Sequence, residues 1–183
     1  MQEKPLKRIF IAVNLPGKVK DEIYEKAGRV IDGNSGKDGL KIVGKENLHI
    51  TLKFVEYVDE EELRGIIENA EKINFQGFEI VLGDAGTFGQ RVLWIGLSEG
   101  EGKLLELATE VQKVTEKGDD RFSPHVTIAR NKSMPANKVR EIVEKINSKQ
   151  IDIRMKVESF EVMESMLGRK GPEYRVVFSR KLI

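Results

Sequence analysis

The sequence predicts an α+β fold built from two similar halves. Segments with the apolar pattern of strands follow one another as often as they alternate with helical segments, which disfavours a doubly wound parallel sheet. The chain of 183 residues has the size of one domain, and no linker-like stretch divides it. With 39% hydrophobic residues, it can bury a full core without disulfides or metal. We therefore expect residues 1–183 to form a single domain.

The first half opens with a buried strand followed by a helix. Residues 9–15 are an apolar run rich in β-branched side chains, the pattern of a strand covered on both faces. Pro16 suits the first turn of a helix. Apolar side chains then recur at helical spacing: Val19, Ile23, Ala27, Val30 and Ile31. Glycine and polar residues predict a loop at 32–39.

Two further strands and a second helix are expected to complete this half. A short strand is predicted at 40–43 and a clearer one at 48–55. Asp59 followed by Glu62 resembles a capping box, which marks the start of a helix. The apolar face of that helix comprises Leu63, Ile66, Ile67, Ala70 and Ile73.

The second half repeats these ingredients. Its strands are predicted at 78–82, 92–97, 122–129, 151–163 and 174–182, the last two joined by a loop at 168–172. A polar turn is expected at 117–120. Two helices are indicated by apolar side chains at helical spacing: Leu104, Leu105, Ala108, Val111 and Val114, and then Val139, Ile142, Val143 and Ile146.

Composition excludes several classes of protein. The chain has no cysteine, so disulfides, thiolate metal sites and cysteine nucleophiles are ruled out. A net charge of +1 argues against a protein that coats long stretches of nucleic acid, although a local patch could still bind one or two phosphates. Charged residues make up 33%, with Glu and Lys dominant, a composition that leans towards a thermophile.

No targeting or membrane segment is expected. Lys4, Lys7 and Arg8 precede an apolar run, as in a signal peptide, but Asn14 and Pro16 end that run too early for one. No stretch approaches the roughly 20 apolar residues of a membrane helix. We therefore expect a soluble cytoplasmic protein.

Two segments share a histidine and a threonine separated by one apolar residue. Residues 47–54 read Asn-Leu-His-Ile-Thr-Leu-Lys-Phe, and residues 123–130 read Ser-Pro-His-Val-Thr-Ile-Ala-Arg. Because side chains alternate between the two faces of a strand, one set is expected to point into the core: Ile50, Leu52 and Phe54, with Val126 and Ile128. The opposite face is expected to carry His49, Thr51 and Lys53, with His125 and Thr127. Arg130 lies out of strict alternation, which leaves its direction open.

These are the only two histidines of the chain, and they occupy the same place in two similar strands. A single histidine on a strand is usually a surface or structural residue, but a matched pair favours a functional site. Imidazole has an unperturbed pKa of about 6.5, so near neutral pH one ring can accept a proton while the other donates one. Hydrolysis of a phosphate ester needs both acts, a base for the attacking water and an acid for the departing oxygen.

The threonines fit the same chemistry. The hydroxyls of Thr51 and Thr127 can donate hydrogen bonds to the free oxygens of an anionic phosphodiester. A metal site is the competing interpretation, but it would need carboxylates on the same face, and neither segment offers Asp or Glu there. We therefore expect catalysis by His49 and His125 without a metal or cofactor.

The sequence resembles the two-histidine (2H) phosphoesterase superfamily, whose signature is a pair of His-x-Thr-x motifs. More narrowly, it resembles the bacterial and archaeal RNA 2′,3′-cyclic phosphodiesterases, also called 2′-5′ RNA ligases. The likeness runs through nearly the whole chain, at 8–13, 46–54, 92–96, 121–130 and 171–174.

This resemblance implies a fold and a reaction. The fold is bilobal, with two antiparallel sheets flanking a central cleft and helices on the outside. The activity is hydrolysis of RNA or nucleotide 2′,3′-cyclic phosphate ends to 2′-phosphates, with 2′-5′ ligation as the same chemistry run with a ribose hydroxyl. His49 would protonate the leaving ribose oxygen and His125 would activate water. The implied partner is RNA, including tRNA halves, and the implied state is a monomer.

The sequence departs from the family at a few places. Ile42 stands where Trp is frequent, Glu56 or Tyr57 stands where Gly is frequent, and the loop at 166–170 differs. These departures are expected to affect the fit of the substrate rather than the acid–base pair.

Five other side chains are interpreted from the sequence. Arg130 is a candidate phosphate ligand or an exposed strand end, and Lys53 is a cleft residue or a solvated lysine. Phe10 is a candidate for stacking on a base or a core residue. Tyr174 and Trp94 are expected to pack.

Three functions stay open at this point. The leading one is a metal-independent RNA 2′,3′-cyclic phosphodiesterase. The others are a related 2H enzyme that acts mainly on 2′-5′-linked or other cyclic nucleotides, and a module that binds RNA ends without turnover. Intact histidines beside threonines weigh against the last, because Arg or Lys would serve for binding alone.

Overall fold

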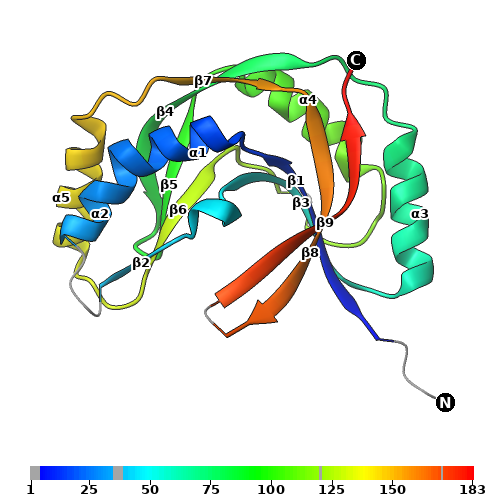
Figure 1. The fold of residues 1–183 in the computed structure, drawn as a ribbon, viewed down its shortest axis with the longest axis horizontal. Helices are drawn as coiled ribbons and strands as arrows, with labels where there is room; N and C mark the ends of the chain where they lie inside the picture. Colours follow the sequence, from blue (N-terminus) through cyan, green and yellow to red (C-terminus); the bar gives the residue numbers. More distant parts are fainter. Residues whose placement is uncertain (1–4, 35–38, 120, 170) are drawn as a thin grey trace.

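The structure, a computed structural model, describes residues 5–34, 39–119, 121–169 and 171–183 (Figure 1). Its strands are β1 (Lys7–Asn14), β2 (Leu40–Ile42), β3 (His49–Val58), β4 (Phe78–Phe88), β5 (Val92–Glu99), β6 (Val126–Asn131), β7 (Ile153–Val157), β8 (Ser159–Gly168) and β9 (Gly171–Lys181). Its helices are α1 (Gly17–Ile23), α2 (Arg29–Asn34), α3 (Glu60–Glu71), α4 (Glu101–Gln112) and α5 (Ala136–Asn147), with a π turn η1 (Tyr24–Gly28) and a 3₁₀ turn η2 (Lys45–Asn47). The loops and turns predicted at 32–39, 117–120 and 168–172 lie partly outside the described residues. In their described parts, α2 extends to Asn34 and strands β8 and β9 extend to Gly168 and from Gly171, so the loops predicted at 32–39 and 168–172 are too long.

All the strands pair antiparallel, in the order β7-β4-β5-β6-β3-β1-β8-β9, and β2 pairs with β6. The junction between β3 and β6 rests on a single residue pair, Ile50 with Val126. The sheet therefore consists of two lobes, one built on β6 and the other on β3, joined at their centre. The predicted α+β fold with two antiparallel sheets is confirmed, and the two sheets are continuous through this one pair.

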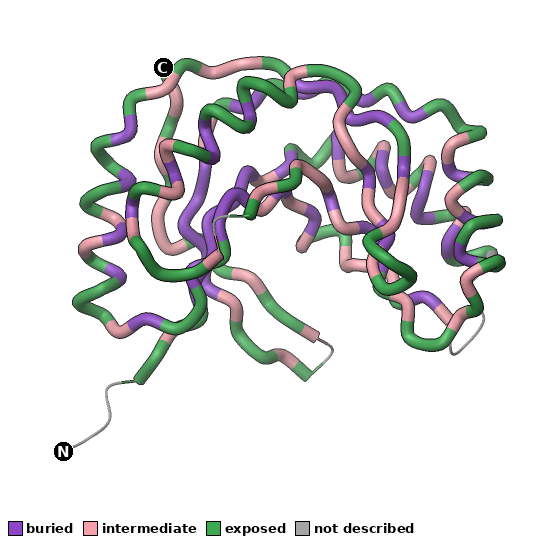
Figure 2. The backbone as a smooth tube through the Cα atoms, turned by 180° about the vertical axis from the view of Figure 1, so that it is seen from behind, coloured by how far each residue is buried: buried purple, intermediate pink, exposed green. Residues whose placement is uncertain are grey.

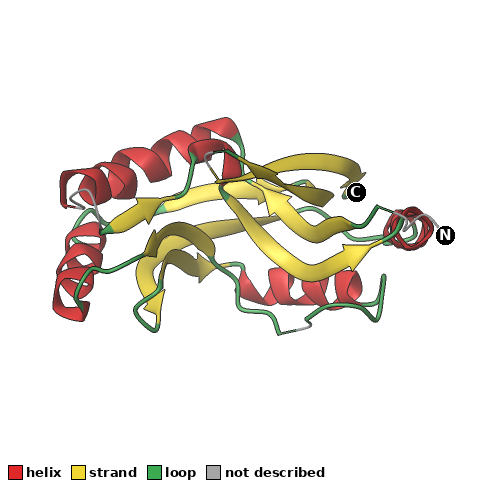
Figure 3. Cartoon of the chain, turned by 90° about the horizontal axis from the view of Figure 1, so that it is seen from below, coloured by secondary structure: helices red, strands yellow, loops and turns green. Residues whose placement is uncertain are grey.

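Helices lie around the outside of the strands (Figure 3). Helix α1 contacts β7, α5 contacts β4, and α2 contacts α5, so these three helices cover the lobe of β6. Helix α4 contacts β3 and α3 contacts β9, so these two cover the lobe of β3. The predicted capping box starts α3: Asp59 Oδ1 accepts from the backbone N–H groups of Glu61 and Glu62, and Glu62 Oε2 accepts from the Asp59 N–H.

Buried residues occur in both lobes (Figure 2). Their side chains form one cluster that runs through both. It includes Ile11 and Ile50 on one side of the junction, Leu93 and Val126 on the other, and Phe160 in β8, all fully enclosed. A second, smaller cluster of Phe10, Ala12 and Met163 lies apart from it, on the cleft face of β1 and β8. Because the main core crosses the junction, burial of apolar surface holds the lobes together.

The predicted elements differ from the observed ones where the chain changes partner. The strand predicted at 151–163 is two strands, because β7 pairs with β4 in one lobe and β8 pairs with β1 in the other. The helix predicted from Val19 contains the π turn η1, where the N–H of Arg29 reaches the carbonyl of Tyr24. Among the described residues, no helix is long and apolar enough to cross a membrane.

Candidate active site

The junction between β3 and β6 brings the two His-x-Thr segments together. Ile50 and Val126 are both fully buried and face each other. An antiparallel register with this pair at its centre sets the flanking residues crosswise, His49 towards Thr127 and Thr51 towards His125. Since neighbours on a strand point to opposite faces, all four side chains leave the sheet on the face opposite the buried pair.

A cleft of about 580 Å³ lies on that face. It is lined by all five residues that the sequence predicts for the site: His49, Thr51, His125, Thr127 and Arg130. Residues of β2, η2, β4, β5 and the start of β9 complete its walls, among them Ile42, Asn47, Phe88, Val92 and Tyr174.

Each of the two central strands has a β-bulge just after its threonine. In β3, Ile11 pairs with Lys53 and the next residue of β1 pairs with Thr51, so Leu52 is the extra residue. In β6, Leu93 pairs with Ala129 and the next residue of β5 pairs with Thr127, so Ile128 is extra. A bulge inserts one residue and thereby reverses the facing of the side chains that follow.

This reversal corrects the prediction for Phe54 and Lys53. Strict alternation placed Phe54 in the core and Lys53 in the cleft, but Phe54 lines the cleft with 48% of its surface exposed, and Lys53 is 1% exposed on the other face. The positive charge of Lys53 contributes to the low pKa of Asp119, about 2, which is due mainly to hydrogen bonds from Arg121. Lys53 is therefore neither a solvated lysine nor a cleft residue.

The same reversal settles the direction of Arg130, which the sequence left open. Beyond the bulge at Ile128, Arg130 is exposed and lines the cleft. It occupies in β6 the place that Phe54 occupies in β3, five residues after the histidine. Its positive charge lowers the pKa of both His49 and His125, so the guanidinium is close enough to act on each ring.

His49 is held by hydrogen bonds at both ring nitrogens. Nδ1 lies 2.7 Å from the carbonyl oxygen of Asn47, and Nε2 lies 2.9 Å from Thr51 Oγ1. Because a backbone carbonyl only accepts, Nδ1 carries a hydrogen. Nε2 is therefore the nitrogen that can exchange a proton with a substrate in the cleft. The ring also packs against Phe10 and Tyr174, with centroids 5.0 and 5.3 Å away.

His125 has the same orientation with fewer contacts. Its Nδ1 lies 2.7 Å from the carbonyl oxygen of Ser123, which again assigns the hydrogen to Nδ1. Within the described chain, Nε2 has no hydrogen-bond partner. The ring packs edge-on against Phe88 at a centroid distance of 4.8 Å, and Phe88 packs on Trp94. Trp94 is thus a packing residue, as predicted.

The two rings differ in their pKa values. Burial lowers the pKa of His49 to about 4, an effect that the hydrogen bond to Asn47 partly offsets and the charges of Lys20, His125 and Arg130 reinforce. Burial also lowers the pKa of His125, with Arg130 adding to the effect. In the free protein near neutral pH, both rings are therefore neutral, with an unprotonated Nε2.

Several residues of the site were not predicted from the sequence. Asn47 accepts from His49 through its backbone, and its side-chain amide donates to the carbonyl of Pro172 at 2.9 Å, which ties η2 to β9. From α1, Lys20 Nζ donates to the carbonyl of Glu46 in η2 at 2.9 Å. Tyr174 was expected only to pack, and it does pack on Phe10 and His49, but it also lines the cleft. Only the resemblance of residues 171–174 hinted at this place.

Phe10 is a core residue, one of the two predicted alternatives, and stacking on a base stays a prediction. The ring is 5% exposed, as in a core, yet it lies in the small cluster on the cleft face rather than in the main core.

Among the described residues, no three His, Cys, Asp or Glu side chains group in a way that could hold a metal ion.

Comparison with known proteins agrees with this arrangement. The family model described as the 2′-5′ RNA ligase superfamily matches residues 23–169. An RNA 2′,3′-cyclic phosphodiesterase of Archaeoglobus fulgidus is 38% identical over 176 residues, 92% of this chain and 96% of the relative. One of Methanocaldococcus jannaschii is 33% identical over 180 residues, 93% of this chain and 98% of the relative.

Solved structures share the fold. Escherichia coli LigT complexed with ATP superposes with a TM-score of 0.78 at 23% identity, covering 97% of this chain and 99% of LigT. A protein of Thermus thermophilus, TT0787, superposes with a TM-score of 0.76 at 26% identity, covering 95% of this chain and 97% of that one. The resemblance found in the sequence is confirmed: the chain belongs to the 2′-5′ RNA ligase superfamily of two-histidine phosphoesterases.

Proposed function

We propose that this protein hydrolyses the 2′,3′-cyclic phosphate ends of RNA or nucleotides to 2′-phosphomonoesters. His49 and His125 are the catalytic residues, and Thr51, Thr127 and Arg130 bind the phosphate. Attack by a ribose 5′-hydroxyl in place of water, which joins 2′-5′ ends and releases the same 3′ oxygen, is the same chemistry. Residues 1–183 act as one domain, and the monomeric state and cytoplasmic location stay predictions.

The observation that carries this proposal is the matched placing of the two histidines. They stand crosswise to the two threonines at the junction of the lobes, and Arg130 faces both. A phosphodiester held there meets two imidazole nitrogens, the Thr127 hydroxyl and one cation. Protonation of His49 at Nε2 frees the Thr51 hydroxyl to donate to the phosphate as well. This set can move two protons and hold the charge that develops on the phosphate oxygens.

We assign the acid to His49 and the base to His125, and the ring environments are compatible with both roles. The free Nε2 of His125 can accept a proton from the attacking water, while Nδ1–H stays bonded to Ser123. His49 must carry a proton on Nε2 to act as the acid, although burial keeps it neutral in the free protein. The negative charge of the bound phosphate favours the imidazolium, so binding of the substrate supplies the condition for protonation. The relatives named as RNA 2′,3′-cyclic phosphodiesterases support the substrate class.

Binding of a cyclic phosphate should therefore be coupled to proton uptake. The free pKa of His49 is about 4, and the anion raises the pKa in the complex. Between these two values, affinity is expected to rise as pH falls, and it should level off below the free pKa, where His49 is already protonated. Calorimetry of His125→Ala with 2′,3′-cyclic GMP measures this, since the charge of that nucleotide is constant over the range. An affinity that does not change with pH contradicts the coupling. So does an affinity that changes equally with pH in the double variant His49→Ala/His125→Ala.

Product analysis on an oligonucleotide with a 2′,3′-cyclic phosphate end tests the function itself. We expect a 2′-phosphate product, formed equally with and without EDTA, because two imidazoles supply both proton transfers. A linear 3′-phosphate oligonucleotide is the control and should stay unchanged.

Other outcomes have distinct meanings. Loss of activity with EDTA and recovery with one divalent cation would rule out the metal-free mechanism. Binding at micromolar concentration without turnover would indicate an RNA-end binder instead. Turnover confined to 2′-5′-linked or other cyclic nucleotides would keep the chemistry and change the substrate.

A further inference from the structure

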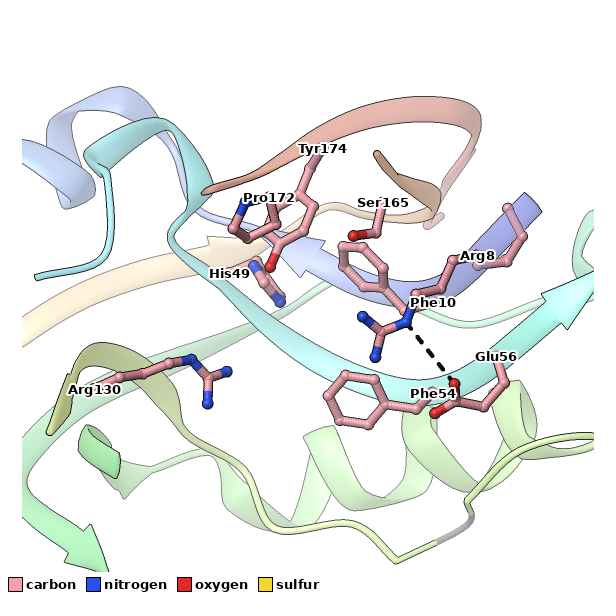
Figure 4. A pocket seen from close by; sticks show the side chains of 10 residues that line it. Arg8, Phe10, His49, Phe54, Glu56, Arg130, Ser165, Pro172 and Tyr174 are labelled. Carbon is pink, nitrogen blue, oxygen red and sulfur yellow. Dashed lines mark ion pairs between the residues drawn. The ribbon is translucent and has the colours of Figure 1, made fainter. Parts of the chain in front are cut away.

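A second cavity of about 380 Å³ opens beside His49 (Figure 4). It shares His49, Phe54, Arg130, Pro172 and Tyr174 with the catalytic cleft, so the two spaces are continuous. Neither His125 nor the two threonines line it. The cavity thus lies on the His49 side of the catalytic groups, away from His125 and the threonines.

Aromatic rings form the walls of this cavity. Phe10 and Tyr174 pack against each other with centroids 4.9 Å apart, and both pack on His49. Phe54, turned into the cavity by the bulge at Leu52, leaves about half of its surface exposed. Exposed rings beside a phosphate site are suited to stacking on a nucleobase, because every base offers a π-face.

The end of the cavity is polar and charged. Arg8 and Glu56 face each other there as an ion pair, with Arg8 Nε 3.8 Å from Glu56 Oε2, and both side chains are half exposed (Figure 4). Ser165, whose Cα pairs with Arg8, stands next to them. A second phosphate would meet the Glu56 carboxylate as well as the cation, so this end suits a neutral group with hydrogen-bond donors.

The backbone of Glu56 has a strained conformation. Its φ is +73°, in the left-handed region that glycine adopts with least strain. It stands at a second bulge of β3, where Val55 is the extra residue opposite Ile9 and Phe10. Strained backbone that carries a charged side chain into a cavity points to a use for that side chain.

We propose that this cavity binds the base of the nucleotide that carries the cyclic phosphate, and that Glu56 and Arg8 select guanine. Guanine alone has two adjacent N–H donors, N1 and N2, which match the two oxygens of one carboxylate. Its O6 lies beside N1 and accepts from the neighbouring Arg8. Adenine and cytosine place an acceptor nitrogen beside their amino group, and uracil has a single N–H between two carbonyls. The rings of Phe54 and Tyr174 contact the base face, and Phe10 supports Tyr174 from behind.

This inference rests on the proposed function in one respect. If His49 protonates the departing ribose oxygen, the ribose and its base lie on the His49 side of the phosphate. The cavity beside His49 is then the space that the base enters.

Steady-state kinetics with the four 2′,3′-cyclic nucleoside monophosphates test the proposal. We expect the wild-type kcat/KM for cyclic GMP to exceed that for cyclic AMP by roughly 10-fold, the scale of one bidentate base contact. In Glu56→Gln this ratio should collapse, because the amide NH2 faces a guanine donor. Glu56→Gly should do the same while easing the left-handed backbone, so a loss of preference there does not come from misfolding. Glu60→Gln, which alters an ion pair with Lys7 outside the cavity, is the matched control and should keep the ratio.

Equal kcat/KM for the four nucleotides in wild type, or an unchanged preference in both Glu56 variants, would overturn the proposal. If neither the four nucleotides nor a cyclic-ended oligonucleotide is hydrolysed, the proposed function fails. If the oligonucleotide alone is hydrolysed, the function stands. In both cases the base site is then judged by calorimetry with the four nucleoside 2′-monophosphates. Tighter binding of 2′-GMP that depends on Glu56 would support the site in that case, and equal affinities would overturn it.

Discussion

Replacement of His125 by alanine is expected to lower the turnover of a cyclic-ended RNA by about 10²–10⁴-fold, the usual contribution of a positioned acid or base. The variant loses the one ring nitrogen that can take the proton of the attacking water. Replacement of His49 by alanine should cost a similar factor, because the ribose oxygen then departs without a proton. Initial rates on a cyclic-ended oligonucleotide measure both effects.

Isosteric variants separate catalysis from support of the fold. His125→Asn keeps an N–H that can donate to the Ser123 carbonyl but has no titratable nitrogen, so we expect it to be as inactive as His125→Ala. His125 lines the open cleft outside the main core, so thermal unfolding of its variants should stay near that of wild type. His49 packs on Phe10 and Tyr174, so His49→Ala should lose some stability but still unfold cooperatively. Unfolded alanine variants together with an active His125→Asn would show that the histidines are structural. Because the two residues act on one reaction, the double alanine variant should lose less than the product of the single losses.

The sequence predicts the central residues of the cleft better than the residues around its edge. The paired His-x-Thr segments were recognised because the residue types repeat with the same local spacing, and spacing within a strand decides facing directly. That inference holds only up to the first bulge. Beyond Leu52 and Ile128 the phase reverses, so strict alternation predicts the wrong faces for Phe54 and Lys53 and gives no direction for Arg130.

The bulges themselves had a weak sequence signal. In β6, Ile128 and Ala129 are two consecutive apolar residues, a break in alternation that matches their shared burial. In β3 the equivalent pair is Leu52 and Lys53, and the charge of Lys53 concealed the break. A buried lysine is held by its tertiary surroundings, Asp119 among them, and those are not visible along the chain.

Helices can be predicted from the sequence where the apolar pattern is long or a capping box marks the first turn. The capping box at Asp59 and the apolar stripes of the later helices depend on neighbouring residues only. The split between β7 and β8 depends on which strand each half meets, because the chain leaves one lobe for the other near Glu158. Arg8, Glu56 and Tyr174 likewise belong to one cavity only because β1 lies between β3 and β8.

Sulfur substitution of the leaving atom separates the two histidine roles. An alkoxide is a poor leaving group and needs a proton as the bond breaks, whereas a thiolate leaves without one. A substrate whose scissile 3′ oxygen is replaced by sulfur therefore bypasses the general acid and still requires the general base. His49→Ala should recover most of its lost rate on this substrate, while His125→Ala should stay as slow as on the oxygen substrate.

The division of acid and base work between His49 and His125 is the central claim, and the low pKa of His49 in the free protein makes it a demanding one. The most direct test is the ratio of kcat/KM on the sulfur and oxygen substrates for wild type, His49→Ala and His125→Ala. The account predicts a ratio raised in His49→Ala alone. A ratio raised in His125→Ala instead would reverse the acid and base assignments, and a ratio unchanged in both variants would contradict acid–base catalysis by this pair.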